Sequence, residues 1–203
     1  MSKTTAGTMR LQREAKMAVK DLETMIKKSG KIDQQNFICL PDPENVYVWY
    51  FIIFGLERPY NGHYIGKVTC KDNYPTSAPN ITIFTDNGKF RTQKMQPDGI
   101  CLSISDFHQE SWNPAWKVTQ ILLGLVSFWL SNEYTYGSVE ESYDYSSEVL
   151  KSDERSLYFA SISRADVLAH EKFEAIFRPY AAAIGIEEPQ TDAEWDRINQ
   201  KRT

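Results

Sequence analysis

The stretch that decides the fold runs from Gly99 to Trp116 and reads GICLSISDFHQESWNPAW. It brings Cys101 and His108 close together in the chain and ends in a signal for the start of a helix. In that signal Asn113 is the expected N-cap and Pro114 the expected first helical residue. The stretch leaves two readings of Cys101 open: a reactive nucleophile, or a small buried side chain, which is a common state of free cysteine.

A nearly all-buried helix is expected directly after this stretch. Its apolar residues recur at helical spacing over a broad face; they are Val118, Ile121, Leu122, Leu125, Val126 and Trp129. Two further amphipathic stretches, 146–163 and 164–180, predict helices near the C-terminus. Residues 181–203 are mostly polar, so we expect a flexible tail there, with short turns at 181–186 and 195–198.

Upstream of the cysteine, three segments predict an antiparallel meander. The segments 46–55 and 63–70 are rich in β-branched and aromatic residues, and the turn sequence RPYNG separates them. Residues 80–84 would add a third strand. From Thr85 to Gly99 the chain is polar and carries turn signals, so Cys101 is expected at the end of a long irregular segment.

An amphipathic helix is expected from Thr8, its N-cap, to Lys28. Its apolar face contains Leu11, Ala15, Val19, Leu22 and Ile26. A basic stripe lies beside that face, made of Arg13, Lys16, Lys20 and Lys27. The stripe is either a solvated surface or a docking site for an acidic partner. With the meander and the later helices, this helix predicts an α+β fold.

Composition excludes several classes of function. The chain has 203 residues, of which 41% are hydrophobic, enough for one sizeable core. A net charge of −4 argues against a surface that grips nucleic acid. The N-terminus has no apolar signal sequence, and the apolar run from Ile121 to Leu130 is roughly half of the ~20 residues that a membrane span needs.

The cysteine pattern predicts free thiols and no metal site. The count of 3 is odd, which fits a reducing compartment and no disulfide framework. No CxxC motif and no Cys/His pair at zinc-ligand spacing occurs, so we expect neither a metal nor a cofactor. The triplet Ile-Cys-Leu occurs at both Cys39 and Cys101, and only their neighbours distinguish the two.

The order of several motifs resembles ubiquitin-conjugating enzymes. These motifs are RLQREAK, RPYNGHYIGKV, NYPTSAPNI, TDNGKF, the stretch from Gly99 to Trp116, ILLGLVSFW and GSVEES. The chain looks most like the ubiquitin-conjugating enzyme 6 and J-type group, which elsewhere carries a tail anchored in the endoplasmic reticulum membrane. The resemblance implies that family's fold, a catalytic core over residues 8–180, and a polar tail over 181–203.

The resemblance also implies the site residues. Cys101 would carry ubiquitin as a thioester, since a thiolate is both a good nucleophile and a modest leaving group. Asn87 in TDN matches the family's His-Pro-Asn motif and would stabilise an oxyanion. Thr85 and Asp86 replace the histidine and proline, and Asn87 lies unusually far from Cys101, so a simple Asn-Gly turn is the competing reading.

The implied partners are ubiquitin, a ubiquitin-activating enzyme, a ligase of the RING type and substrate proteins. ATP would be used by the activating enzyme and not by this chain. The resembling enzymes dock ligases through their first helix and two loops. Here the helix presents Arg10, Arg13 and Lys16, and the loops are YPTSAP (74–79) and SWNPAW (111–116), the second of which presents Trp112, Pro114 and Trp116. The tryptophans could instead only seat the next helix. Because the chain ends in DRINQKRT without an apolar anchor, we expect a cytoplasmic protein, or one at the cytosolic face of the endoplasmic reticulum if a tail has been removed.

His108 is the expected proton acceptor of the reaction. Histidine is the side chain suited to proton transfer near neutral pH, and Asp106 or Glu110 would orient its ring or the acceptor. The acceptors would be lysine and also serine or threonine hydroxyls. Three alternatives stay open: a carrier of another ubiquitin-like modifier, a non-catalytic ubiquitin-binding scaffold, and a cysteine hydrolase that uses Cys101 with His108.

Overall fold

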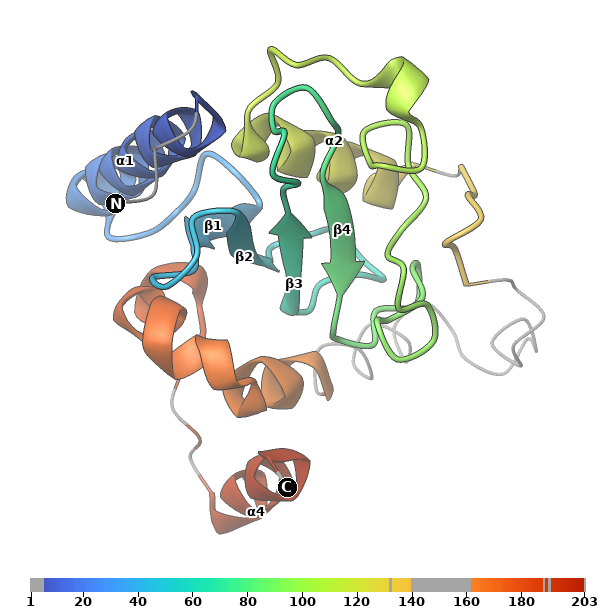
Figure 1. Ribbon diagram of the computed structural model, residues 1–203. Coiled ribbons are helices and arrows are strands. Elements are labelled where there is room, and N and C mark those ends of the chain that lie inside the picture. Colours follow the sequence, from blue (N-terminus) through green and yellow to red (C-terminus); the bar gives the residue numbers. More distant parts are fainter. Residues whose placement is uncertain (1–5, 132, 140–161, 188, 190, 203) are drawn as a thin grey trace.

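The computed structural model describes residues 6–131, 133–139, 162–187, 189 and 191–202. It is an α+β fold in which helices surround one antiparallel sheet (Figure 1). The elements in chain order are α1 (Ala6–Ser29), β1 (Phe37–Pro41), β2 (Val48–Ile53), β3 (Tyr64–Thr69), β4 (Asn80–Ile83), η1 (Gln109–Ser111), α2 (Val118–Leu130), a helix over 162–169, η2 (Phe173–Phe177), η3 (Arg178–Tyr180), η4 (Ala182–Ile184) and α4 (Asp192–Arg202).

The sheet has 4 strands in the order β1-β2-β3-β4, one more than the sequence predicts. The missed strand, β1, pairs Phe37 with Ile53 and Pro41 with Trp49. Its sequence FICLP is a short apolar run without polar alternation, because both of its faces are buried. The expected meander of the other three strands is confirmed, with Val48 opposite Thr69 and Gly66 opposite Ile83.

Alternate residues of the sheet face two different hydrophobic cores. Phe37, Cys39 and Phe51 point into the core that contains α2. Their neighbours Ile38 and Ile52 point into a second core. The second core is closed by residues from the C-terminal segment, namely Ala165, Val167, Leu168, Phe173, Ile176, Phe177, Ala183, Ile184, Ile186 and Ile198.

The helix boundaries near the N-terminus and near Asn113 differ from expectation. The chain is already helical from Ala6, and Thr8, instead of capping α1, bonds through its hydroxyl to the Tyr47 hydroxyl at 2.9 Å. α2 begins at Val118 and not at Pro114. Asn113 caps a tight turn: its side-chain oxygen accepts the Ala115 N–H at 2.9 Å, and its carbonyl accepts the Trp116 N–H at 3.0 Å.

The predicted buried face of α2 is confirmed residue by residue. On α1, Leu11 and Leu22 are buried as expected, but the buried face is completed by Glu14, Ala18 and Met25. The predicted helix over 146–163 lies almost entirely outside the described residues. In the expected tail, Ile184, Ile186 and Ile198 belong to the second core and 192–202 form α4; the domain limits 8–180 and 181–203 themselves stay a prediction.

Candidate functional site

Cys101 lies on an irregular segment that runs beside β4, as the turn signals predict. The Ile100 N–H donates to the Ile81 carbonyl at 2.8 Å, which holds this segment against the strand edge. Gly99 has φ +91°, and a Cβ there would lie 2.7 Å from the Ile81 carbonyl oxygen. Only glycine combines that backbone conformation with that close approach.

Asp106 anchors the cysteine segment to the rest of the sheet edge. Its Oδ1 accepts a hydrogen bond from the Asn80 amide at 3.2 Å, and its Oδ2 lies 3.3 Å from the Lys71 ammonium. The same Asn80 amide also donates to the Asp98 carbonyl. Asn80 therefore holds the loop on both sides of Cys101, at Asp98 and at Asp106, and the two Asp106 oxygens contact Asn80 and Lys71.

Burial distinguishes the three cysteines. Cys39 and Cys70 are 2% and 5% exposed, whereas Cys101 is half-buried. Burial raises the pKa of both the Cys39 and the Cys70 thiols well above the usual range, since the thiolate cannot be solvated there. A buried neutral thiol is a poor nucleophile, so Cys101 is the cysteine suited to acyl chemistry.

His108 contacts the Cys101 thiol. Its Nε2 lies 3.3 Å from the Cys101 Sγ, and its Nδ1 lies 2.9 Å from Oε1 of Glu110. The Glu110 pKa is lowered, first by a hydrogen bond from its own backbone N–H and then by His108, so this carboxylate is ionised near neutral pH. Of the two carboxylates expected near the ring, Glu110 is the one bonded to it.

Asn87 is buried and all its amide bonding capacity is used inside its own loop. The Nδ2 donates to the carbonyls of Thr85 at 2.9 Å and Phe90 at 3.1 Å. The Oδ1 accepts the N–H groups of Lys89 at 3.0 Å and Phe90 at 2.7 Å. Asn87 is therefore a turn-forming residue in this structure, and it could donate to an oxyanion only by releasing one of these bonds.

The connector 133–139, which follows α2, packs against the backbone of Cys101. The Thr135 hydroxyl donates to the Cys101 carbonyl, and a Cβ on Gly137 would lie 3.2 Å from the Cys101 nitrogen. The connector is tied to the Asn87 loop, because Val139 N–H donates to the Lys89 carbonyl at 3.0 Å. Nothing in the sequence signals this contact, since Thr135 is 34 residues from Cys101.

Comparison with known proteins gives the class of this site. The family model described as "Ubiquitin-conjugating enzyme" matches residues 10–155, more than half of the chain. The chain belongs to the ubiquitin-conjugating enzyme family. The matched region includes α1 from Arg10 onward, the whole sheet, Cys101, His108 and α2.

Named relatives in the family share about two fifths of the aligned residues. A Dictyostelium discoideum protein named ubiquitin-conjugating enzyme E2 J2-like is 42% identical over 131 residues, which are 62% of this chain and 75% of that protein. The Kluyveromyces lactis ubiquitin-conjugating enzyme E2 6 is 43% identical over 52% of this chain and 41% of its own length. The Homo sapiens E2 J2 is 41% identical over 55% of this chain and 43% of its own. The chain thus spans less than half the length of the last two.

The solved structures that resemble this chain include one described as a ubiquitin-conjugating enzyme from Plasmodium yoelii. It aligns with a TM-score of 0.48 and 25% identity over 64% of this chain and 75% of that one.

Arg10 is expected as a ligase-docking residue, but its guanidinium forms hydrogen bonds within the molecule. Its Nε donates to Glu14 at 2.8 Å, and its NH groups donate to the carbonyls of Pro114 and Trp116. Glu14 is 7% exposed and also accepts the Val118 N–H, at the start of α2, at 2.9 Å. This pair joins α1 to the loop before α2.

The other expected docking residues divide into exposed and buried ones. Arg13, Lys16 and Pro114 are exposed. Trp112 is 8% exposed and donates its indole N–H to the Pro75 carbonyl at 2.7 Å, while Trp116 packs edge-on against it with centroids 5.6 Å apart. Trp112 therefore seats the loop, and of the expected docking residues Arg13, Lys16 and Pro114 are the exposed ones.

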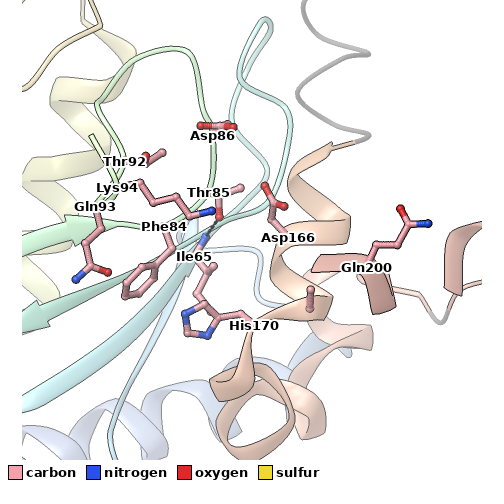
Figure 2. Close-up of a pocket in the computed structure, with 11 residues that line it drawn as sticks. Ile65, Phe84, Thr85, Asp86, Thr92, Gln93, Lys94, Asp166, His170 and Gln200 are labelled. Carbon is pink, nitrogen blue, oxygen red and sulfur yellow. Dashed lines mark hydrogen bonds between the residues drawn. The ribbon is translucent and has the colours of Figure 1, made fainter. Parts of the chain in front are cut away.

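A cavity of about 620 Å³ lies at a different part of the fold, between the end of β4 and the C-terminal helices. Figure 2 shows Phe84 and Asp86 on the segment that follows β4, and Asp166 and His170 on the C-terminal helical segment. Cys101, His108 and Asn87 are not among the residues that line it. Within the described ranges, no cluster of three or more His, Cys, Asp or Glu side chains could hold a metal ion, and no helix has the length and apolar character of a membrane span.

Proposed function

We propose that this chain is an active ubiquitin-conjugating enzyme. In this proposal Cys101 accepts ubiquitin from an activating enzyme as a thioester and passes it, with a ligase, to lysine and to serine or threonine of substrate proteins. The observation that carries it is the half-buried Cys101 thiol in contact with His108, in a chain whose other two cysteines are buried. ATP is spent by the activating enzyme, so the chain itself needs no cofactor.

The likeness to E2 6 and J2 proteins supports a role in protein quality control and degradation. A place in the cytoplasm, at the cytosolic face of the endoplasmic reticulum when a membrane tail is present, would suit that role. The partners in this proposal are ubiquitin, its activating enzyme and a RING-type ligase. The exposed Arg13, Lys16 and Pro114 are the residues that would contact the activating enzyme or the ligase.

His108 serves as the general base towards the acceptor in this proposal. An attacking hydroxyl must lose its proton, and a neutral imidazole within reach of the thioester can take it. The 2.9 Å bond from Nδ1 to Glu110 supports this role, because it leaves the lone pair of Nε2 facing Cys101. The proposed oxyanion role of Asn87 would require its amide to exchange one loop hydrogen bond for the reacting oxygen.

The carrier role is tested by incubation with activating enzyme, ATP and ubiquitin, followed by non-reducing electrophoresis. We expect an adduct that thiol reductant destroys, while Cys101→Ser gives an adduct that resists reductant because an oxygen ester replaces the thioester. Cys39→Ala is the matched control and should charge normally. A reductant-sensitive adduct that survives Cys101→Ala would overturn the proposal.

The base role is tested on the charged protein. Discharge onto free serine or threonine should be measurable beside discharge onto lysine, and His108→Ala should slow the hydroxyl reaction more, by about a hundredfold. Charging should stay normal. Equal hydroxyl discharge by the parent and the variant would remove His108 from the mechanism.

The other candidates are separated by the same assays. Charging with a different ubiquitin-like modifier and its own activating enzyme, but not with ubiquitin, would identify the carrier of that modifier. Ubiquitin binding without any adduct would identify a scaffold. The reachable Cys101 thiol favours the carrier over the scaffold, because a scaffold has no use for a reactive thiol beside an imidazole.

A further inference from the structure

Cys101, His108 and Glu110 form a linear array of thiol, imidazole and carboxylate. The contacts are 3.3 Å from Sγ to Nε2 and 2.9 Å from Nδ1 to Oε1. Because an ionised carboxylate only accepts hydrogen bonds, Nδ1 of the neutral imidazole carries the ring proton, and its Nε2 then faces the sulfur with its lone pair. This is the order of groups that cysteine hydrolases use, although here one short segment supplies all three.

Acylation of Cys101 changes what Nε2 can bind. The free thiol can donate its proton to Nε2, but a thioester sulfur has no proton to give. The lone pair of Nε2 then lies beside the sulfur and accepts no hydrogen bond from Cys101. One water molecule could bridge Nε2 and the carbonyl carbon of the thioester. A general base acts efficiently through one bound water at such a distance.

Water has access to the base. The His108 and Glu110 side chains are 43% and 72% exposed, and Cys101 is half-buried rather than enclosed. The Asp106 carboxylate is held by Lys71 and Asn80, and so does not compete with Glu110 for the ring. The thiol, imidazole and carboxylate are therefore held in a fixed arrangement that solvent water can reach.

We propose that the charged form of this protein is also a thioester hydrolase, with water as the acceptor. His108 Nε2 takes a proton from water while the water oxygen bonds to the thioester carbonyl carbon. The tetrahedral intermediate then breaks the bond from carbon to Sγ, and the imidazolium returns its proton to the leaving sulfur. The products are the modifier with a free carboxylate and the Cys101 thiol, so the protein resets itself when no acceptor protein arrives. The proposal rests on the proposed function, because only a charged Cys101 offers the bond that is cut.

Water and a serine hydroxyl present the same O–H group to His108. A carrier that is built to transfer to hydroxyls therefore also has a base in place for water, and the two rates should fall together when the base is removed. A substrate protein would receive the modifier only if it reached the thioester before water hydrolysed it.

The test loads Cys101 without the activating enzyme, from a synthetic thioester between ubiquitin and a small thiol. After removal of the excess reagent, the charged protein is incubated in ¹⁸O-labelled water without any acceptor. We expect the thioester to decay and the released ubiquitin to carry one ¹⁸O in its terminal carboxylate. His108→Gln should slow this decay by about a hundredfold, and Glu110→Gln by a smaller factor because it only orients the ring.

The controls separate the two proposals. Glu57→Gln changes an exposed carboxylate outside the site and should decay as the parent does. Decay of the parent should also be slower in deuterated water, because His108 moves a proton in the rate-limiting step. Normal loading with identical decay in the parent and His108→Gln would overturn the hydrolase and leave the carrier intact, whereas failure to load Cys101 by either route would overturn both.

Discussion

Asn87 lies in the segment that matches a catalytic motif of the family, and in this structure its amide is bonded within its own loop. Its side chain makes four hydrogen bonds within the loop, two as donor and two as acceptor. The loop in turn contacts the connector 133–139, and Thr135 of that connector holds the Cys101 carbonyl. Its effect on the reaction would therefore reach Cys101 through the backbone.

Replacing Asn87 by alanine should lower the free energy of unfolding by about 2 kcal/mol or more, because buried N–H and C=O groups lose their partners. Asn87→Asp keeps the two acceptor bonds but sets a carboxylate oxygen against the carbonyls of Thr85 and Phe90, so it should also lower the stability. Urea unfolding measures the stability, and single-turnover discharge of the charged protein measures the reaction. Slow discharge with unchanged stability would instead return Asn87 to the oxyanion role.

Arg10 and Arg13 form a matched pair of arginines on α1 with different surroundings. Arg10 donates to Glu14, Pro114 and Trp116, whereas Arg13 is exposed. Arg10→Ala should reduce the free energy of unfolding by roughly 2 kcal/mol through lost charge-assisted hydrogen bonds. Arg13→Ala should change it by less than about 0.5 kcal/mol. Equal losses in thermal unfolding would contradict the structural role given to Arg10.

At the scale of elements, α1 carries the exposed part of the basic stripe. Arg13, Lys16 and Lys20 are exposed, and within the part of the chain that the structure describes none of them forms an ion pair. Reversing all three to glutamate should slow charging through association, and the difference from the parent should shrink as salt is added. Stopped-flow charging at low and high ionic strength measures this. Identical rates at low salt would make the stripe an ordinary solvated surface.

The sequence predicts elements well where one residue pattern controls them. The six buried positions of α2 follow from helical spacing alone, and β2 to β4 follow from their aromatic and β-branched runs. The pattern failed at Phe37–Pro41, because a strand buried on both faces shows no alternation. It failed at Asn113 because the same asparagine and proline serve a turn as well as a helix start.

The site was predictable only as far as its residues are close in sequence. Cys101, His108 and Glu110 lie on one short segment, so their contact could be anticipated from spacing. The partners that fix the segment come from distant elements: Asn80 and Lys71 on the sheet side and Thr135 after α2. Such contacts depend on the folded path of the chain, and no local pattern encodes them.

For the whole molecule, two histidines outside the site tie stability to pH. Burial lowers the pKa of His63 and Arg164 lowers it further, while the 2.8 Å hydrogen bond between its Nε2 and the Ile184 carbonyl opposes them. Burial also lowers the pKa of His170, which packs on Phe84; Lys172 and Lys67 lower it further, while Glu171 opposes them. Both rings lie in or beside the second core, so the stability of that core depends on the protonation of both histidines.

The unfolded chain binds protons on these histidines at a higher pH than the folded chain does. The contribution of these histidines to the free energy of unfolding is therefore fully present above the ordinary imidazole pKa of about 6.5, and it is lost as the pH drops below that value. Urea unfolding between pH 8 and pH 5 should show this fall, and the double variant His63→Gln, His170→Gln should flatten it. A further fall at lower pH, near the ordinary aspartate range, should remain in the variant, because Lys172 lowers the pKa of Asp42. An unchanged slope in the variant would assign the acid sensitivity to other groups.

The two-sided burial of the sheet has a practical consequence for preparing shorter forms of the protein. The matched family region ends at residue 155, yet the side of the sheet that bears Ile38 and Ile52 is covered by residues from Ala165 onward. A fragment trimmed to the family limits would keep Cys101, His108 and α2 while leaving a contiguous aliphatic sheet face open to water. Exposed faces of that kind drive self-association, so such a fragment should be recovered as aggregates, and work on isolated cores should retain the chain through Ile186.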